Sequence, residues 1–143
     1  MQNQKILILN FGGQYDQLIA RRVRECNVYC EVKPYTMTLS EIQAFDPLGI
    51  IFTGGPDSVY KENSYHPAEG IFELGIPILG ICYGCQLLAY HLGGMVTAAE
   101  NENAREYGNT LTFYDDYCML FDGLDEESIS WLSHVDYMKK VPD

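Results

Sequence analysis

The sequence predicts an α/β domain with three layers, in which a mostly parallel, doubly wound sheet lies between helices. Over the first 99 residues, short apolar runs of strand length alternate with segments of helical spacing. Such alternation is typical of parallel strands joined by right-handed crossover helices. The chain has 143 residues, of which 47% are hydrophobic, and this length and composition suit one domain with a buried core. We therefore expect residues 1–143 to form a single domain.

The predicted strands are continuous apolar runs, as expected for strands that are buried on both faces of a parallel sheet. In chain order they are residues 5–10, 29–33, 49–53 and 77–81. Pro34 is expected to end the second strand, because proline has no N–H to donate to a neighbouring strand.

Helical spacing predicts the elements between these strands. The first helix is indicated by apolar residues from Tyr15 to Cys26 that recur three or four positions apart. Short helices are expected at about 40–44, with Ser40 as the cap, and near 67–74. A further helix over 82–92 is closed by two glycines. Beyond Met95 the pattern changes, and 110–114 and 128–133 are predicted as strands.

Charge and hydropathy exclude several classes of function. The formal net charge is −11; residues 1–99 hold 9 acids and 6 bases, and residues 100–143 hold 11 acids and 3 bases. Such a chain repels nucleic acid, although its acidic second part could face a basic partner domain. No run approaches the roughly 18 apolar residues of a membrane span, and the first residues lack the apolar core of a signal peptide. We expect a cytoplasmic protein with neither a nucleic-acid nor a membrane partner.

The strongest chemical signal is a nucleophile elbow centred on Cys82. Residues 80–84 read G-I-C-Y-G, which has the form G-x-nucleophile-x-G at a strand-to-helix turn. The turn strains the backbone, so its flanking residues must be small, and the start of a helix favours the thiolate. The N–H of Tyr83 would then point to where an oxyanion forms. A second glycine-rich loop, Gly54-Gly55-Pro56, also follows a strand, so both loops should reach one crevice.

The five cysteines leave other interpretations open. An odd number of cysteines without a signal peptide indicates reduced thiols, and we expect Cys26, Cys30 and Cys118 to pack as small hydrophobic residues. Cys82 and Cys85 form a C-x-x-C pair that could be a redox dithiol. Alternatively, the fold could be a binding module without chemistry. A zinc site would need two more ligands, and the histidines show no ligand spacing, so no metal is expected.

Five segments in order along the chain carry a family resemblance. They read N-F-G-G-Q-Y at 10–15, T-G-G-P-D-S-V at 53–59, G-I-C-Y-G-C-Q at 80–86, R-E-Y-G at 105–108 and W-L-S-H-V-D at 131–136. Together they resemble class I glutamine amidotransferase domains, and in particular the glutaminase domain of GMP synthetases. The resemblance covers nearly the whole chain.

The resemblance implies a role for each site residue. Cys82 would attack the carboxamide of glutamine and form a glutamyl thioester with release of ammonia. The backbone N–H groups of Gly55 and Tyr83 would form the oxyanion hole. The residues implied to bind the substrate are Gly54, Gln86, Ser133, His134 and Val135.

The resemblance also implies partners and cofactors. Ammonia would pass to an ATP-pyrophosphatase synthetase domain or subunit, which aminates xanthosine monophosphate. ATP and magnesium would belong to that synthetase, and the glutaminase domain itself would need no cofactor.

Three departures from the family pattern have consequences. The family's catalytic base lies in a His-Pro-Glu segment beyond the last motif, and the sequence stops at Asp143 before such a segment. Losing a general base costs about 10²–10⁴-fold in rate, so we expect the C-terminally incomplete chain to bind glutamine weakly and hydrolyse it slowly. His134 and Asp136 match the substrate loop, and we do not expect them to complete a triad with Cys82. Val135 replaces a glycine, and Cys85 replaces a methionine.

Overall fold

The computed structural model describes residues 4–99, 106–115 and 117–143. The chain divides into two compact units, one formed by residues 1–96 and 138–143 and the other by residues 97–137. Each is described by itself. Within the described part of the chain, none of the helices has the length and apolarity needed to cross a bilayer.

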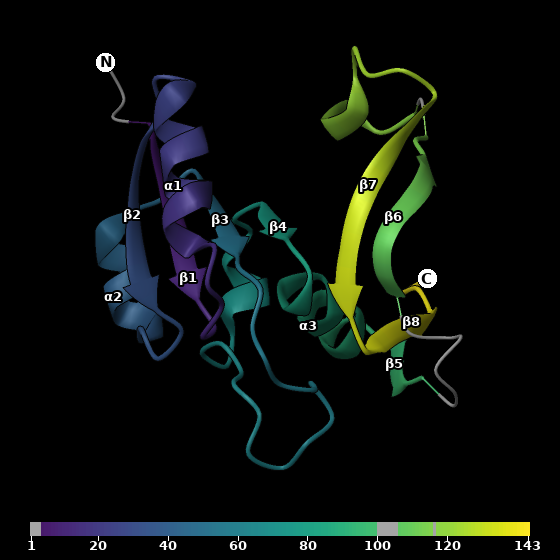
Figure 1. Cartoon of the computed structure of the whole chain (residues 1–143). Coiled ribbons are helices and arrows are strands. Elements are labelled where there is room, and N and C mark those ends of the chain that lie inside the picture. Colours follow the sequence, from purple (N-terminus) through teal and green to yellow (C-terminus); the bar gives the residue numbers. More distant parts are fainter. Residues whose placement is uncertain (1–3, 100–105, 116) are drawn as a thin grey trace. The chain divides into compact units, whose positions relative to one another are not determined.

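The first unit is built on a four-stranded parallel sheet (Figure 1). Its strands are β1 (Lys5–Asn10), β2 (Tyr29–Pro34), β3 (Gly49–Phe52) and β4 (Ile78–Gly80), in the order β2-β1-β3-β4. All four predicted strands are confirmed. The register pairs Phe52 with Gly80, so the segments that follow β3 and β4 leave the same edge of the sheet side by side.

Helices cover both faces of this sheet, which confirms the predicted three layers. Helix α1 (Asp16–Glu25) packs on one face, where Ile8, Ala20 and Cys30 form a buried cluster. Helices α2 (Leu39–Phe45) and α3 (Tyr83–His91) contribute to the main core on the other face. Alternate residues of β1 supply the two clusters, as strand geometry requires.

Three local predictions were wrong. The cap of α2 is Thr38 rather than Ser40, since the Thr38 side chain and Glu41 form a reciprocal capping box. The helix expected near 67–74 is only a four-residue 3-10 turn, η1 (Ile71–Leu74), because left-handed Gly70 and Gly75 bound it on either side. Cys26 is exposed rather than packed.

The second unit contains an antiparallel pair, β6 (Glu106–Phe113) and β7 (Glu127–His134), with a short 3-10 turn, η3 (Met119–Phe121), between them. Both strands were predicted, although each is longer than expected. Arg105, which opens the R-E-Y-G motif, lies outside the described residues. Two further strands, β5 (Met95–Ala98) and β8 (Asp136–Lys140), pair with each other and were not predicted. They are only four and five residues long, so their sequences carry little periodicity.

Candidate active site

Cys82 stands at the turn between β4 and α3 in a strained backbone conformation. Its φ and ψ are 55° and −113°, a region that non-glycine residues rarely adopt. The elbow is tied to the end of β3, because Ile81 N–H donates to Phe52 O at 3.0 Å and Gly84 N–H donates to Thr53 O at 3.1 Å. This geometry is what the G-x-C-x-G pattern predicts.

The two glycines of the elbow are required by close backbone contacts. A Cβ on Gly80 would lie 2.6 Å from Gly84 O, and a Cβ on Gly84 would overlap Phe52 O. Real Cβ atoms do not approach backbone this closely. Helix α3 can therefore reach the sheet only because these two positions have no side chain.

The second glycine-rich loop lies beside Cys82. A Cβ on Gly54 would be 3.6 Å from Cys82 Cβ and 4.0 Å from its Sγ. Cys82 itself is exposed, so its sulfur is not enclosed in the core. The expectation that both loops reach one place is confirmed.

Two backbone N–H groups next to Cys82 lack an acceptor within the described residues. Tyr83 provides the first N–H of α3, which no turn of that helix can satisfy, and Gly55 lies in the loop. Neither N–H donates a hydrogen bond to any residue that the structure describes. As far as the described residues go, both are left for another acceptor, such as a substrate oxygen.

The Tyr83 side chain fixes the start of α3 within the core. Its ring is buried and lies 5.9 Å from the Phe11 ring, and its hydroxyl donates to Tyr65 O at 2.6 Å. Burial raises the pKa of Tyr83 to about 12. The hydroxyl therefore remains a donor at any physiological pH. Its bond to Tyr65 O and the burial of the ring together hold the Tyr83 backbone in place.

Cys85 is in a different environment from Cys82. It is half-buried in the first turn of α3, and burial, followed by the proximity of Cys82, raises the pKa of its thiol. A thiol that resists ionisation is a poor partner in dithiol exchange. Among the described residues no group of three or more metal-ligating side chains occurs.

A histidine pair connects the segment after β3 to α3. His66 Nε2 lies 2.8 Å from Ser64 Oγ and 3.1 Å from Val59 O, and His66 Nδ1 lies 2.9 Å from His91 Nε2. Because the Val59 carbonyl can only accept, His66 Nε2 is the donor in that contact. Both rings are thus used in holding the loop to the helix.

Stability should fall below about pH 6.5 because of His91. Burial, and then the proximity of His66, lowers the pKa of His91 from its ordinary 6.5. Above pH 6.5 His91 is neutral in both the folded and the unfolded chain, so this stability is fully present. As the pH falls below 6.5, His91 takes up a proton in the unfolded chain before it does so in the folded chain. The free energy of unfolding therefore decreases until the pH has passed the lower pKa of His91 in the folded chain. Urea unfolding at about pH 7.5 and about pH 5.5 should show the loss in the wild type.

The control for this pH effect is His91→Gln, which cannot titrate. Its unfolding free energy should change less between the two pH values than that of the wild type. An equal pH dependence in both proteins would contradict the assignment to His91.

The remaining predicted residues lie in two places. Gln86 is 7% exposed on α3, and its N–H donates to Cys82 O at 3.1 Å. Ser133 and His134 end β7, Val135 follows them, and all three belong to the second unit. His134 Nδ1 lies 2.8 Å from the backbone oxygen of Asp136. Their roles in substrate binding stay predictions.

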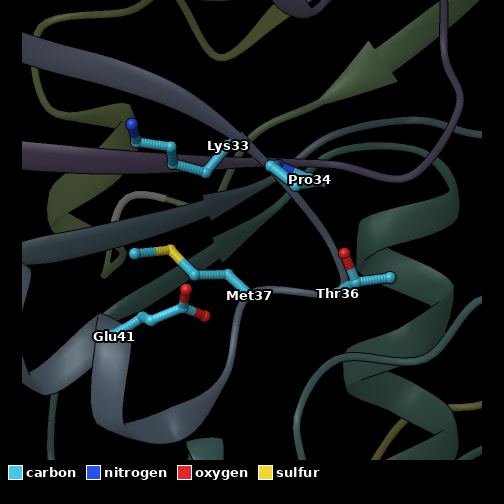
Figure 2. Close-up of a pocket in the computed structure, with 5 residues that line it drawn as sticks. All are labelled: Lys33, Pro34, Thr36, Met37 and Glu41. Carbon is cyan, nitrogen blue, oxygen red and sulfur yellow. The ribbon is translucent and has the colours of Figure 1, made fainter.

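An open pocket of about 340 Å³ lies elsewhere, at the end of β2 (Figure 2). It is lined by Lys33, Pro34, Thr36, Met37 and Glu41. Its charged groups already have partners within the chain: Lys33 Nζ lies 2.9 Å from Glu31, and Glu41 accepts from Thr38 N–H at 2.7 Å. The pocket includes none of the predicted site residues.

Sequence reasoning missed one residue of the site, Thr53. It follows β3 directly and is buried, and its hydroxyl bonds both Phe11 N–H and Gly54 O. The only sequence signal was a polar residue between an apolar strand and a glycine loop.

Comparison with known proteins agrees with this geometry. A family model for class-I glutamine amidotransferases matches residues 7–143. The chain is 55% identical to the GMP synthase [glutamine-hydrolyzing] of Caldicellulosiruptor saccharolyticus and 53% identical to that of Clostridium botulinum. Each match covers all of this chain but only 27% of the relative, so the chain spans about a quarter of the length of these relatives.

Two solved structures are similar over most of the chain. A protein of Thermoplasma acidophilum that is assigned as part of a GMP synthase has a TM-score of 0.78 and 28% identity, over 100% of this chain and 70% of its own. A glutamine amidotransferase of Thermotoga maritima has a TM-score of 0.75 and 22% identity, over 97% of this chain and 64% of its own; this second likeness concerns the fold alone. Since the family model matches nearly all of the sequence, the chain belongs to the class-I glutamine amidotransferase family.

Proposed function

We propose that this chain is the glutaminase part of an amidotransferase that makes GMP. The observation that carries the proposal is the exposed Cys82 on its strained elbow, next to two backbone N–H groups without an acceptor among the described residues. The names of the relatives, which are glutamine-hydrolysing GMP synthases, support the choice of glutamine.

The proposed reaction begins with attack of Cys82 Sγ on the carboxamide carbon of glutamine. The carbonyl oxygen becomes an oxyanion, which the N–H groups of Gly55 and Tyr83 would stabilise. Collapse of this intermediate breaks the carbon–nitrogen bond, and the nitrogen leaves as ammonia once it has gained a proton. Water then hydrolyses the glutamyl thioester to glutamate and restores the thiol.

The proton transfers require a general acid and base. We propose a histidine outside residues 1–143 for this role, as the family resemblance implies. The described contacts support this choice, because His66, in the loop after β3, and His91, at the end of α3, bond each other. General acid–base catalysis contributes about 10²–10⁴-fold in rate, so this histidine should speed both formation and hydrolysis of the thioester.

Substrate binding is proposed to involve residues from three of the motifs, at 53–59, 80–86 and 131–136. Gly54 lies beside Cys82 and would contact the substrate near the thiol. Gln86, together with Ser133, His134 and Val135, would bind its amino-acid end. Val135 does not have a positive φ, so the expected backbone strain from valine in place of the family's glycine is absent in this chain.

The partner of the glutaminase is proposed to be an ATP-pyrophosphatase synthetase domain or subunit. It would use ATP and magnesium to activate xanthosine monophosphate, which the ammonia then aminates. This pairing is consistent with the greater length of the relatives, of which this chain covers 27%. We expect the protein to work in the cytoplasm.

A glutamine analogue that carries a chloromethyl ketone tests the proposal. The chain should be treated near neutral pH in a Cys26→Ser background, since Cys26 is also exposed. Peptide mapping by mass spectrometry should find Cys82 modified and Cys85 unmodified, because the thiol of Cys85 is half-buried and its pKa is raised. Excess glutamine should slow the reaction.

The alternatives give different patterns in the same experiment. A redox dithiol would be modified at both Cys82 and Cys85, and it would form a reversible disulfide. A binding module without chemistry would leave both thiols unmodified. Modification of Cys82 at a rate that glutamine does not affect would contradict a glutamine site.

A further inference from the structure

Thr53 is the point at which three segments of the active site are joined. It is 1% exposed. Its backbone N–H donates to Leu9 O at 3.2 Å, and its carbonyl accepts from Gly84 N–H at 3.1 Å. Its hydroxyl accepts from Phe11 N–H at 3.2 Å and donates to Gly54 O at 3.2 Å. The backbone bonds would survive substitution, but the two hydroxyl bonds depend on the side chain.

The bond from Thr53 to Gly54 O determines the orientation of one peptide group. In a planar trans peptide, the C=O of Gly54 and the N–H of Gly55 point in opposite directions. The carbonyl is held on the side of the Thr53 hydroxyl and Gly13, since a Cβ on Gly13 would lie 2.5 Å from Gly54 O. The Gly55 N–H must therefore point away from that side.

A peptide between two glycines is otherwise easy to rotate. Glycine has access to a much wider range of φ and ψ than other residues, so neither Gly54 nor Gly55 resists a flip of the peptide between them. A flipped peptide would present a carbonyl oxygen instead of an N–H, which would repel an oxyanion rather than stabilise it. Something other than the local backbone must fix this peptide.

We propose that Thr53 is a positioning residue, whose hydroxyl holds the Gly54–Gly55 peptide so that the Gly55 N–H serves the oxyanion hole beside Cys82. This inference rests on the proposed glutaminase function. It adds a residue that does not touch the substrate and acts only through the neighbouring peptide. This role requires a hydroxyl at position 53 that can donate a hydrogen bond. Serine should therefore be able to substitute for threonine, and valine should not.

The test compares two reactions of Cys82 in the chain and its variants. Acylation by the γ-nitrophenyl ester of glutamate passes through an oxyanion, and its good leaving group needs no acid, so nitrophenolate release measures it directly. Alkylation by iodoacetamide is a direct displacement that forms no oxyanion. The ratio of the two rates therefore reports on the oxyanion hole and not on thiol exposure.

Thr53→Val keeps the shape of the side chain and removes the hydroxyl. We expect it to lower the acylation rate by about 10²-fold, as for loss of one oxyanion donor, with the iodoacetamide rate unchanged. Thr53→Ser should retain the acylation rate. Thr53→Ala also lacks the hydroxyl and is smaller, so it provides a second variant if the valine protein fails to fold.

Two outcomes would overturn the role of Thr53 while leaving the glutaminase function in place. One is a normal acylation rate in both hydroxyl-free variants. The other is an equal fall in both reactions, which would indicate loss of structure around Cys82. If the wild-type chain reacts with iodoacetamide but releases no nitrophenolate, the proposed function itself fails, and the role of Thr53 fails with it.

Discussion

Replacement of Cys82 by alanine should lower the proposed hydrolysis of glutamine by about 10⁴–10⁶-fold. Without the thiol no thioester can form, and the neighbouring N–H groups can only assist attack by water. Ammonia release from glutamine, measured at saturating substrate, gives the result.

The matched control for Cys82→Ala is Cys85→Met. Cys85 is half-buried in the first turn of α3, and methionine is a flexible apolar substitute that fills irregular space. Its activity should remain close to that of the wild type. If the two variants lose activity to a similar extent, the two thiols act as a pair, and a single nucleophile is the wrong description.

Replacement of Gly84 by alanine should cost about 3 kcal/mol or more in the free energy of unfolding. Gly84 is buried, and its new Cβ would overlap Phe52 O and lie 2.6 Å from Phe52 Cβ. Most of what it meets is backbone at the end of β3, which cannot move without breaking the contact between β3 and α3. Chemical denaturation with a linear extrapolation measures the loss.

Gly75→Ala separates steric overlap from backbone strain. Gly75 has a positive φ of 69°, and apart from Gly75 and its two chain neighbours no described atom lies within 4 Å of the place that an added methyl group would take. Alanine there should cost only about 1–2 kcal/mol, which is the cost of a left-handed conformation. Equal losses at positions 84 and 75 would mean that close packing of the elbow against β3 is not what requires glycine.

The parallel sheet could be predicted from the sequence because each of its strands is a short apolar run between turn residues. Buried parallel strands have no polar face, so they stand out from the amphipathic helices between them. β5 and β8 could not be found in this way. Their pairing joins residues about 40 positions apart in sequence, and nothing local indicates it.

In the candidate site, too, the features that depend on local sequence were predictable and those that depend on distant contacts were not. Cys82 and its flanking glycines are predictable, because a tight strand-to-helix turn dictates small residues at fixed spacing. The proximity of Gly54 to Cys82 follows from the rule that loops gather at the carboxyl edge of parallel strands. Both expectations rest on chain geometry alone.

The supporting contacts were not predictable, since they depend on distant pairs. The hydroxyl of Thr53 matters because Phe11, 42 residues earlier, brings an N–H to it. His66 and His91 are 25 residues apart and meet only once the loop has packed on α3. Such contacts emerge from the folded chain, so sequence spacing does not reveal them.

The proposed oxyanion hole can be tested directly in a crystal structure of the glutamyl thioester. Reaction of the chain with the γ-nitrophenyl ester of glutamate should form this species on Cys82, and rapid cooling of the crystal should trap it. We predict that the thioester oxygen lies about 2.7–3.1 Å from both the Gly55 and the Tyr83 nitrogen atoms. A thioester oxygen that faces solvent, with both N–H groups bonded elsewhere, would contradict the account.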